Sequence, residues 1–119
     1  MINYHTTVYA SLNEILPTHY ELHLHSGLAT PCISYMELSN VDADTGDTLG
    51  YCRLQFQIKV WGHDIAVLQQ YAQQIDKAMR ALGFKRVGAN ELYDNQSTMK
   101  QKILTYEALA LERFEEDLE

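Results

Sequence analysis

The stretch YCRLQFQIKVWGHD at residues 51–64, continued by IAVLQQYAQQIDKAMRAL at residues 65–82, decides the fold of this chain. In its first part apolar and polar side chains alternate, with the two-residue period of a strand that buries one face. The apolar set is Cys52, Leu54, Phe56, Ile58 and Val60, and the polar set is Arg53, Gln55, Gln57 and Lys59. We therefore expect a long strand over residues 49–61.

In the second part the apolar residues recur at steps of three and four, which places them on one face of an amphipathic helix. Asp64 is suited to cap the start of this helix by accepting from free backbone N–H groups, and Gly83 is suited to end it. The apolar stripe consists of Ile65, Leu68, Ala72, Ile75, Met79 and Leu82. A long strand leading into a long helix is thus the unit that the other elements must cover.

The residues before this unit predict further elements of a sheet. Residues 3–16 favour a short amphipathic helix that ends before Pro17, because proline disfavours a helical residue in front of it. Residues 19–25 alternate as a half-buried strand, and residues 31–39 are rich in β-branched and aromatic residues, as strands are. Residues 40–50 collect Asn, Asp, Thr and Gly, which favour turns. We expect an acidic loop there between antiparallel strands.

The residues after the long helix are less strongly patterned. Residues 84–87 favour a short strand or an extended arm, and residues 90–95 a polar connection. Residues 100–111 have two open interpretations, because Glu, Ala and Leu favour a helix while a central Thr-Tyr pair and the need to widen the sheet favour a strand. We favour the strand.

These elements define an α+β fold in the order α-β-β-β-α-β. We expect a mostly antiparallel sheet of about four strands, with the N-terminal helix and the long helix packed on one face. A length of 119 residues suits one domain. We assign residues 1–112 to that domain and residues 113–119 to an acidic C-terminal tail.

The composition excludes several classes of protein. A hydrophobic content of 46% with 21% charged residues is that of a folded globular domain. The formal charge of −7 argues against a protein that grips nucleic acid through its phosphates. The N-terminus lacks the pattern of a signal peptide, and no apolar run approaches the roughly 20 residues that span a membrane. Cys32 and Cys52 are expected to be buried, reduced thiols of a cytosolic compartment.

The sequence contains no catalytic motif, but it contains one weak candidate for a metal site. His19, His23 and His25 share one face of the predicted strand, so a metal site is geometrically conceivable. Histidines on a solvated strand face are the commoner explanation. We therefore expect no enzyme and no cofactor, and keep a small ligand-binding or metal-binding domain as an alternative.

The candidate interaction residues are aromatic or charged. Trp61 ends the outward-facing row of the long strand, and Trp, Tyr and Arg are enriched at protein interfaces. An equal alternative is that Trp61 covers the end of the core. The full set of candidates is Trp61, Arg53, Lys59, Tyr93, Asp42, Asp44 and Asp47.

Several of these patterns together resemble the small tail-completion proteins of long-tailed bacteriophages and prophages, also described as head-tail joining or tail-terminator proteins. The resemblance covers residues 4–111. It is carried by QFQIKVWG at 55–62, by Asp76, Ala78 and Leu82, by Gly83-Phe84-Lys85-Arg86, and by ELYD at 91–94.

The resemblance implies a structural protein of the virion, assembled in the cytoplasm of the host bacterium. It implies a homo-oligomeric ring, often of six copies, on the end of the tail tube, with a surface for the head-connector proteins. DNA would pass through the ring without being specifically bound, and no membrane is involved. Such a ring needs a heterologous interface, which we expect at the sheet edge and the loops at 41–50 and 88–98. A generic oligomeric interaction module is the remaining alternative.

Overall fold

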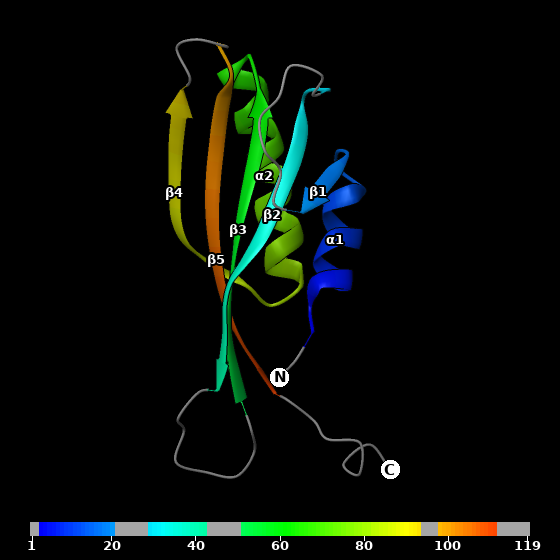
Figure 1. The fold of residues 1–119 in the computed structure, drawn as a ribbon, viewed down its shortest axis with the longest axis vertical. Helices are drawn as coiled ribbons and strands as arrows, with labels where there is room; N and C mark the ends of the chain where they lie inside the picture. The colour runs from blue at the N-terminus through cyan, green and yellow to red at the C-terminus, as the bar shows by residue number, and fades with distance from the viewer. Residues whose placement is uncertain (1–2, 21–28, 43–50, 94–97, 112–119) are drawn as a thin grey trace.

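The computed structural model describes residues 3–20, 29–42, 51–93 and 98–111, which form two helices and five strands (Figure 1). In chain order they are α1 (His5–Asn13), β1 (Thr18–Tyr20), β2 (Cys32–Asp42), β3 (Tyr51–Gly62), α2 (Ile65–Ala81), β4 (Lys85–Tyr93) and β5 (Lys100–Leu111).

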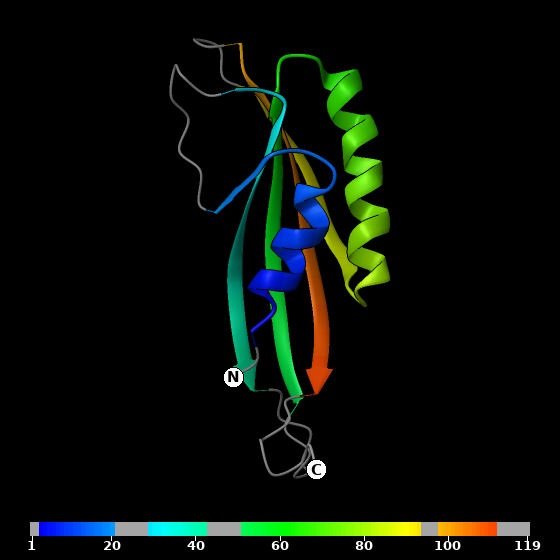
Figure 2. The ribbon, with the colours of Figure 1, turned by 90° about the vertical axis from the view of Figure 1, so that its right-hand side faces the viewer.

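The strands form one sheet in the order β1-β2-β3-β5-β4. Only β1 and β2 are parallel, and every other neighbouring pair is antiparallel. Both helices lie on the same face, α1 over the β1–β2 side and α2 over β3 and β5 (Figure 2). The predicted α+β class and the placement of both helices are therefore confirmed.

The long strand and the long helix supply most of the core, as their periodicity predicts. The apolar side chains of β3 from Cys52 to Val60 are all at most 1% exposed, and Arg53, between them, is exposed. The helix side chains packed against them are also buried: Leu68, Ala72, Ile75 and Met79. Burying a side chain of this size contributes about 1.5–3 kcal/mol each, so this layer dominates the stability of the domain.

Both ends of α2 are closed as the sequence predicts. The Asp64 carboxylate accepts a hydrogen bond from the Ala66 backbone N–H at 2.9 Å. At the other end Gly83 adopts a φ of 95°, and its N–H donates to the Arg80 carbonyl at 3.0 Å. The N–H of Phe84 donates to the Met79 carbonyl at 3.0 Å. This pair of bonds is a Schellman motif, and it turns the chain so that Phe84 is buried.

The structure corrects the prediction for residues 84–98. A strand runs from Lys85 to Tyr93, so the polar connection expected from residue 90 and the loop expected from residue 88 begin too early. Asn90 pairs with Ile103 and Tyr93 pairs with Lys100 across β4 and β5. All but one of the β4 residues are exposed, and an exposed edge strand needs few apolar residues. Its polar sequence therefore looks like that of a loop.

Of three other predictions, one is tested in full by the described residues. Residues 100–111 form the favoured strand, β5, rather than a helix. The predicted strand at residues 19–25 is described only as far as Tyr20, and its remainder lies outside the described residues. The acidic loop expected over residues 40–50 begins too early, because β2 continues to Asp42, and residues 43–50 lie outside the described residues. Within the described part of the chain, no helix has both the length and the apolar character needed to cross a bilayer.

Candidate interaction surfaces

The face of the sheet opposite the helices is polar along its central strand. It carries the row Arg53, Gln55, Gln57 and Lys59 of β3, each of them exposed or partly exposed. The Arg53 Nε lies 3.4 Å from a carboxylate oxygen of Glu107 on β5, and the Arg53 side chain is 52% exposed. An ion pair so open to water contributes at most about 1 kcal/mol. This face is thus solvated, with no described helix covering it.

Trp61 lies at one end of this helix-free face and is buried. It is 4% exposed and packs with Cys32 and Met99 in a small second cluster. Its indole N–H donates to the Ser34 hydroxyl at 2.8 Å. Because Cys32 and Met99 cover the ring, the structure favours the alternative interpretation, in which Trp61 covers the end of the core. The ammonium of the neighbouring Lys59 lies 5.8 Å from the ring centroid.

The two cysteines are buried, as predicted, and neither forms a disulfide. Cys52 belongs to the main core and Cys32 to the small cluster with Trp61. Burial raises the pKa of the Cys32 thiol, because an apolar surrounding disfavours the thiolate. The neutral thiol acts there as a small apolar side chain.

The other predicted interaction residues are widely spread. Tyr93 ends β4, is 54% exposed, and has the Lys100 ammonium 5.7 Å from its ring centroid. Asp42 ends β2 at the opposite half of the sheet. Asp44 and Asp47 lie outside the described residues. The structure therefore does not gather those candidates that it describes into one patch.

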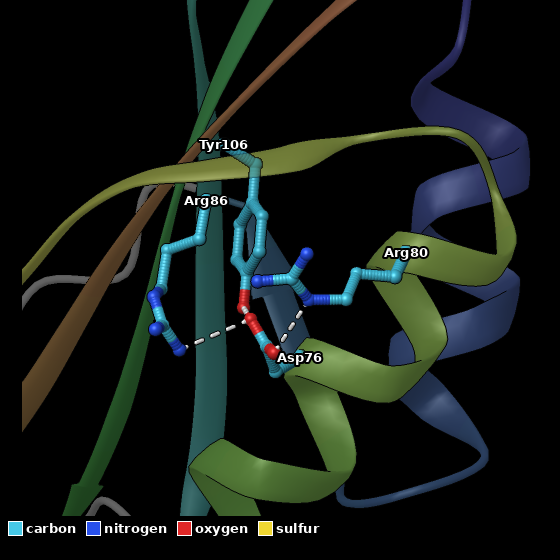
Figure 3. A network of polar contacts seen from close by, with 4 residues as sticks. All are labelled: Asp76, Arg80, Arg86 and Tyr106. Carbon is cyan, nitrogen blue, oxygen red and sulfur yellow. Dashed lines mark hydrogen bonds and ion pairs between the residues drawn. The ribbon is translucent and has the colours of Figure 1, made fainter.

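A polar network that sequence patterns did not predict joins α2, β4 and β5 (Figure 3). One Asp76 oxygen accepts from the Arg80 Nε at 2.8 Å. The other accepts from the Tyr106 hydroxyl at 2.9 Å and from an Arg86 guanidinium nitrogen at 3.3 Å. The four-residue step from Asp76 to Arg80 is visible in the sequence. Arg86 and Tyr106 reach Asp76 because β4 pairs with β5.

The electrostatics of this network explain its protonation states. Partial burial alone would raise the pKa of Asp76, but the hydrogen bonds from Arg80 and Tyr106 and the charges of both arginines outweigh it and lower that pKa. Burial and the neighbouring carboxylate raise the pKa of Tyr106. Asp76 is thus a stable anion held by neutral and cationic donors. The arrangement fastens the helix to the sheet.

A cluster of aromatic rings, also not predicted as a group, lies where α1 meets β1 and β2. The ring of His5 is 5.2 Å from that of Tyr20, 6.0 Å from that of Tyr35 and 5.6 Å from that of Phe56, centroid to centroid. The outer members remain open to solvent, since Tyr20 is 49% and Tyr9 is 42% exposed. Large aromatic side chains with polar tips are favoured in protein contacts.

The histidine hypothesis remains a prediction. His19 is exposed on β1, whereas His23 and His25 lie outside the described residues. Among the residues that the structure does describe, no three His, Cys, Asp or Glu side chains are grouped as metal ligands would be.

The described architecture defines the class of protein as a small α+β domain with two helices on one face of a mixed sheet. The same fold occurs in a chain of a solved structure described as "Virion of native gene transfer agent (GTA) particle". The two chains superpose with a TM-score of 0.60 at 17% identity, over 88% of this chain and 84% of the other. No protein-family model matches the sequence, and a search of curated proteins finds no match. At this identity the likeness establishes the fold.

Proposed function

We propose that this chain is a non-enzymatic structural subunit of a phage-like virion. The observation that supports it most is the shared fold with a chain of a gene transfer agent particle, which extends over most of both chains. Agreement over most of both lengths means that the whole domain is matched, rather than one common substructure. The sequence resemblance to tail-completion proteins supports the same class independently of that superposition.

Within this class we propose the tail-completion role. The subunit would assemble as a homo-oligomeric ring on the end of the tail tube and present a surface to the head connector. Its negative formal charge is consistent with a ring through which DNA passes without being held. The polar, helix-free face and the polar network around Asp76 serve solubility and stability in this proposal, and neither acts as a reaction centre.

Deleting the gene from its genome tests this role. We expect filled heads and tails that fail to join, or tails of irregular length, when induced particles are viewed by electron microscopy. Supplying the chain from a plasmid should restore joined particles, and the protein should then be found in purified virions by mass spectrometry. Normal tails joined to filled heads after deletion would contradict the tail-completion role, and absence of the chain from virions would contradict the broader class.

A further inference from the structure

The aromatic rings at the junction of α1, β1 and β2 are only partly covered. We call Tyr9 of α1, Tyr20 of β1 and Tyr35 of β2 the tyrosine cluster. Tyr35 lies at its centre, with the ring centroid of Tyr20 at 5.2 Å and that of Tyr9 at 6.4 Å. Tyr35 is 6% exposed, whereas the two outer tyrosines are exposed. The cluster therefore presents two accessible rings beside a third that is buried.

The hydroxyl groups of the three tyrosines lie near one another. Burial raises the pKa of the Tyr35 hydroxyl, and the Tyr20 and Tyr9 hydroxyls raise it further, because phenolate charges so close together repel one another. Within the described residues, none of the three hydroxyls forms a hydrogen bond to another protein group. Three phenol oxygens are thus able to accept hydrogen bonds from a group outside the chain.

The chain supplies no lysine or arginine to this part of the molecule. Residues 1–52 contain neither of them. The faces of aromatic rings attract cations, because the ring quadrupole is negative above the plane. Both cation–π contacts of the described residues lie elsewhere, with the Lys59 ammonium over Trp61 and the Lys100 ammonium over Tyr93. The tyrosine cluster has more rings than either of these places and, in the described part of the chain, no lysine or arginine over them.

The charge nearest to the cluster is a carboxylate. A Glu37 oxygen lies 3.7 Å from the Nε2 atom of His5, and the ring of His5 contacts those of Tyr20 and Tyr35. His5 is a cation only when it is protonated. The Glu37 side chain is 18% exposed, so it acts through its field rather than by direct contact with a partner. An anionic ligand would be repelled by this carboxylate, whereas a cationic ligand would be attracted.

We propose that the tyrosine cluster binds an arginine side chain of a partner protein. A planar guanidinium stacks on an exposed tyrosine ring and donates N–H groups to phenol oxygens, whereas a lysine ammonium is a compact point charge that does not stack. The formal charge of −7 attracts a basic partner over a longer distance. One such contact is weak, so it anchors a larger interface. The inference concerns a contact surface and does not depend on the virion role.

Short peptides with blocked ends test the contact. The probe is glycine–arginine–glycine, and the matched control is glycine–citrulline–glycine, because citrulline has nearly the shape of arginine without its charge. NMR spectra of the tyrosine rings, recorded during a titration at low salt, give both the affinity and the place of binding. We expect the signals of Tyr9, Tyr20 and Tyr35 to shift with a dissociation constant of about 1–10 mM. Those of Tyr93 should stay, and the citrulline peptide should bind at least about fivefold more weakly.

Three variants separate the ring from the hydroxyl and the cluster from the rest of the surface. Tyr20→Leu removes an exposed ring and should raise the dissociation constant of the arginine peptide about threefold to tenfold. Tyr20→Phe keeps the ring and loses only the hydroxyl, so the increase should be smaller. Tyr93→Leu removes an equally exposed tyrosine that already has a lysine over its ring, and it should leave the dissociation constant unchanged. Thermal melting verifies that each variant is folded.

Several results would overturn the proposal. Ring signals of the wild-type cluster that stay in place at the highest soluble concentration of the arginine peptide would do so, and this test needs no variant. Equal affinity for the citrulline peptide would exclude recognition of charge, and tighter binding of glycine–glutamate–glycine would make the cluster an anion site. Equal affinity for glycine–lysine–glycine would exclude selection of the guanidinium. A loss of affinity in Tyr93→Leu as large as that in Tyr20→Leu would show that binding is not confined to the cluster.

Discussion

The two faces of the sheet differ in the burial and the polarity of their side chains. The helix-covered face holds a continuous core in which Leu54, Phe56 and Ile58 are fully buried beneath α2. The helix-free face is polar along β3, and Cys32, Trp61 and Met99 form a small buried cluster at one end of it. The buried apolar side chains of the first face stabilise the fold, and the polar side chains of the second face contact water. Substitutions of similar size should therefore have very different effects on the two faces.

The largest effect is expected from a charge in the helix-covered face. Leu68→Asp would place a carboxylate where the leucine is 1% exposed, under the sheet and without a partner. The free energy of unfolding should fall by more than about 4 kcal/mol, enough to unfold a small domain. Circular dichroism and denaturant titration measure it. Gln69→Asp, on the exposed side of the same helix turn, is the matched control, and an equal loss there would refute the distinction.

Trp61→Ala tests whether the small cluster behaves as core despite lying on the polar face. We expect a loss of about 3–5 kcal/mol in the free energy of unfolding, the usual cost of removing a buried aromatic side chain. Trp61→Phe keeps most of the packing and loses the hydrogen bond to Ser34, so it should cost clearly less. A Trp61→Ala variant as stable as the wild type would instead return Trp61 to the surface and to the interface hypothesis.

Tyr106→Phe removes one hydroxyl from the polar network under α2. The ring stays buried while the bond to Asp76 is lost, which should lower the free energy of unfolding by about 1 kcal/mol. A double-mutant cycle with Asp76→Asn isolates the coupling between the two groups. Additive effects of the two substitutions would show that the 2.9 Å contact contributes nothing specific to stability.

The pH dependence of stability should carry a small contribution from Asp76. Its pKa is lowered in the folded protein, so its contribution is present above the pKa of an unperturbed aspartate, near 3.9, and is lost as the pH falls through the folded value. Asp76→Asn should therefore flatten the acid side of the stability profile measured by denaturant titration. Glu14→Gln, an exposed carboxylate in none of these ion pairs, should leave that profile nearly unchanged. The reverse ranking would exclude Asp76 as a source of the acid sensitivity.

Much of the fold follows from local patterns. The two-residue period from Cys52 to Val60, the helical stripe from Leu68 to Met79 and the caps at Asp64 and Gly83 all depend on residues near one another in the chain. These local spacings favour the same elements in any sequence, and here they predict the helix-covered face.

The edges and the polar network could not be predicted in this way. Nearly all residues of β4 are exposed, so this strand can have a polar composition that resembles that of a connecting loop. Tyr106 contacts Asp76 only because β5 lies between β3 and β4. The burial of Trp61 likewise depends on Met99, 38 positions later in the chain.

The sequence by itself thus determined the long strand, the long helix, the α+β class and the concentration of every lysine and arginine beyond residue 52. Tertiary structure decided that β4 lies at one end of the sheet order and that Trp61 belongs to the core. The physical reason is that local periodicity reports which side of an element is apolar. Strand order and strand pairing, which decide the neighbours of each side, are set by contacts between residues far apart in the chain.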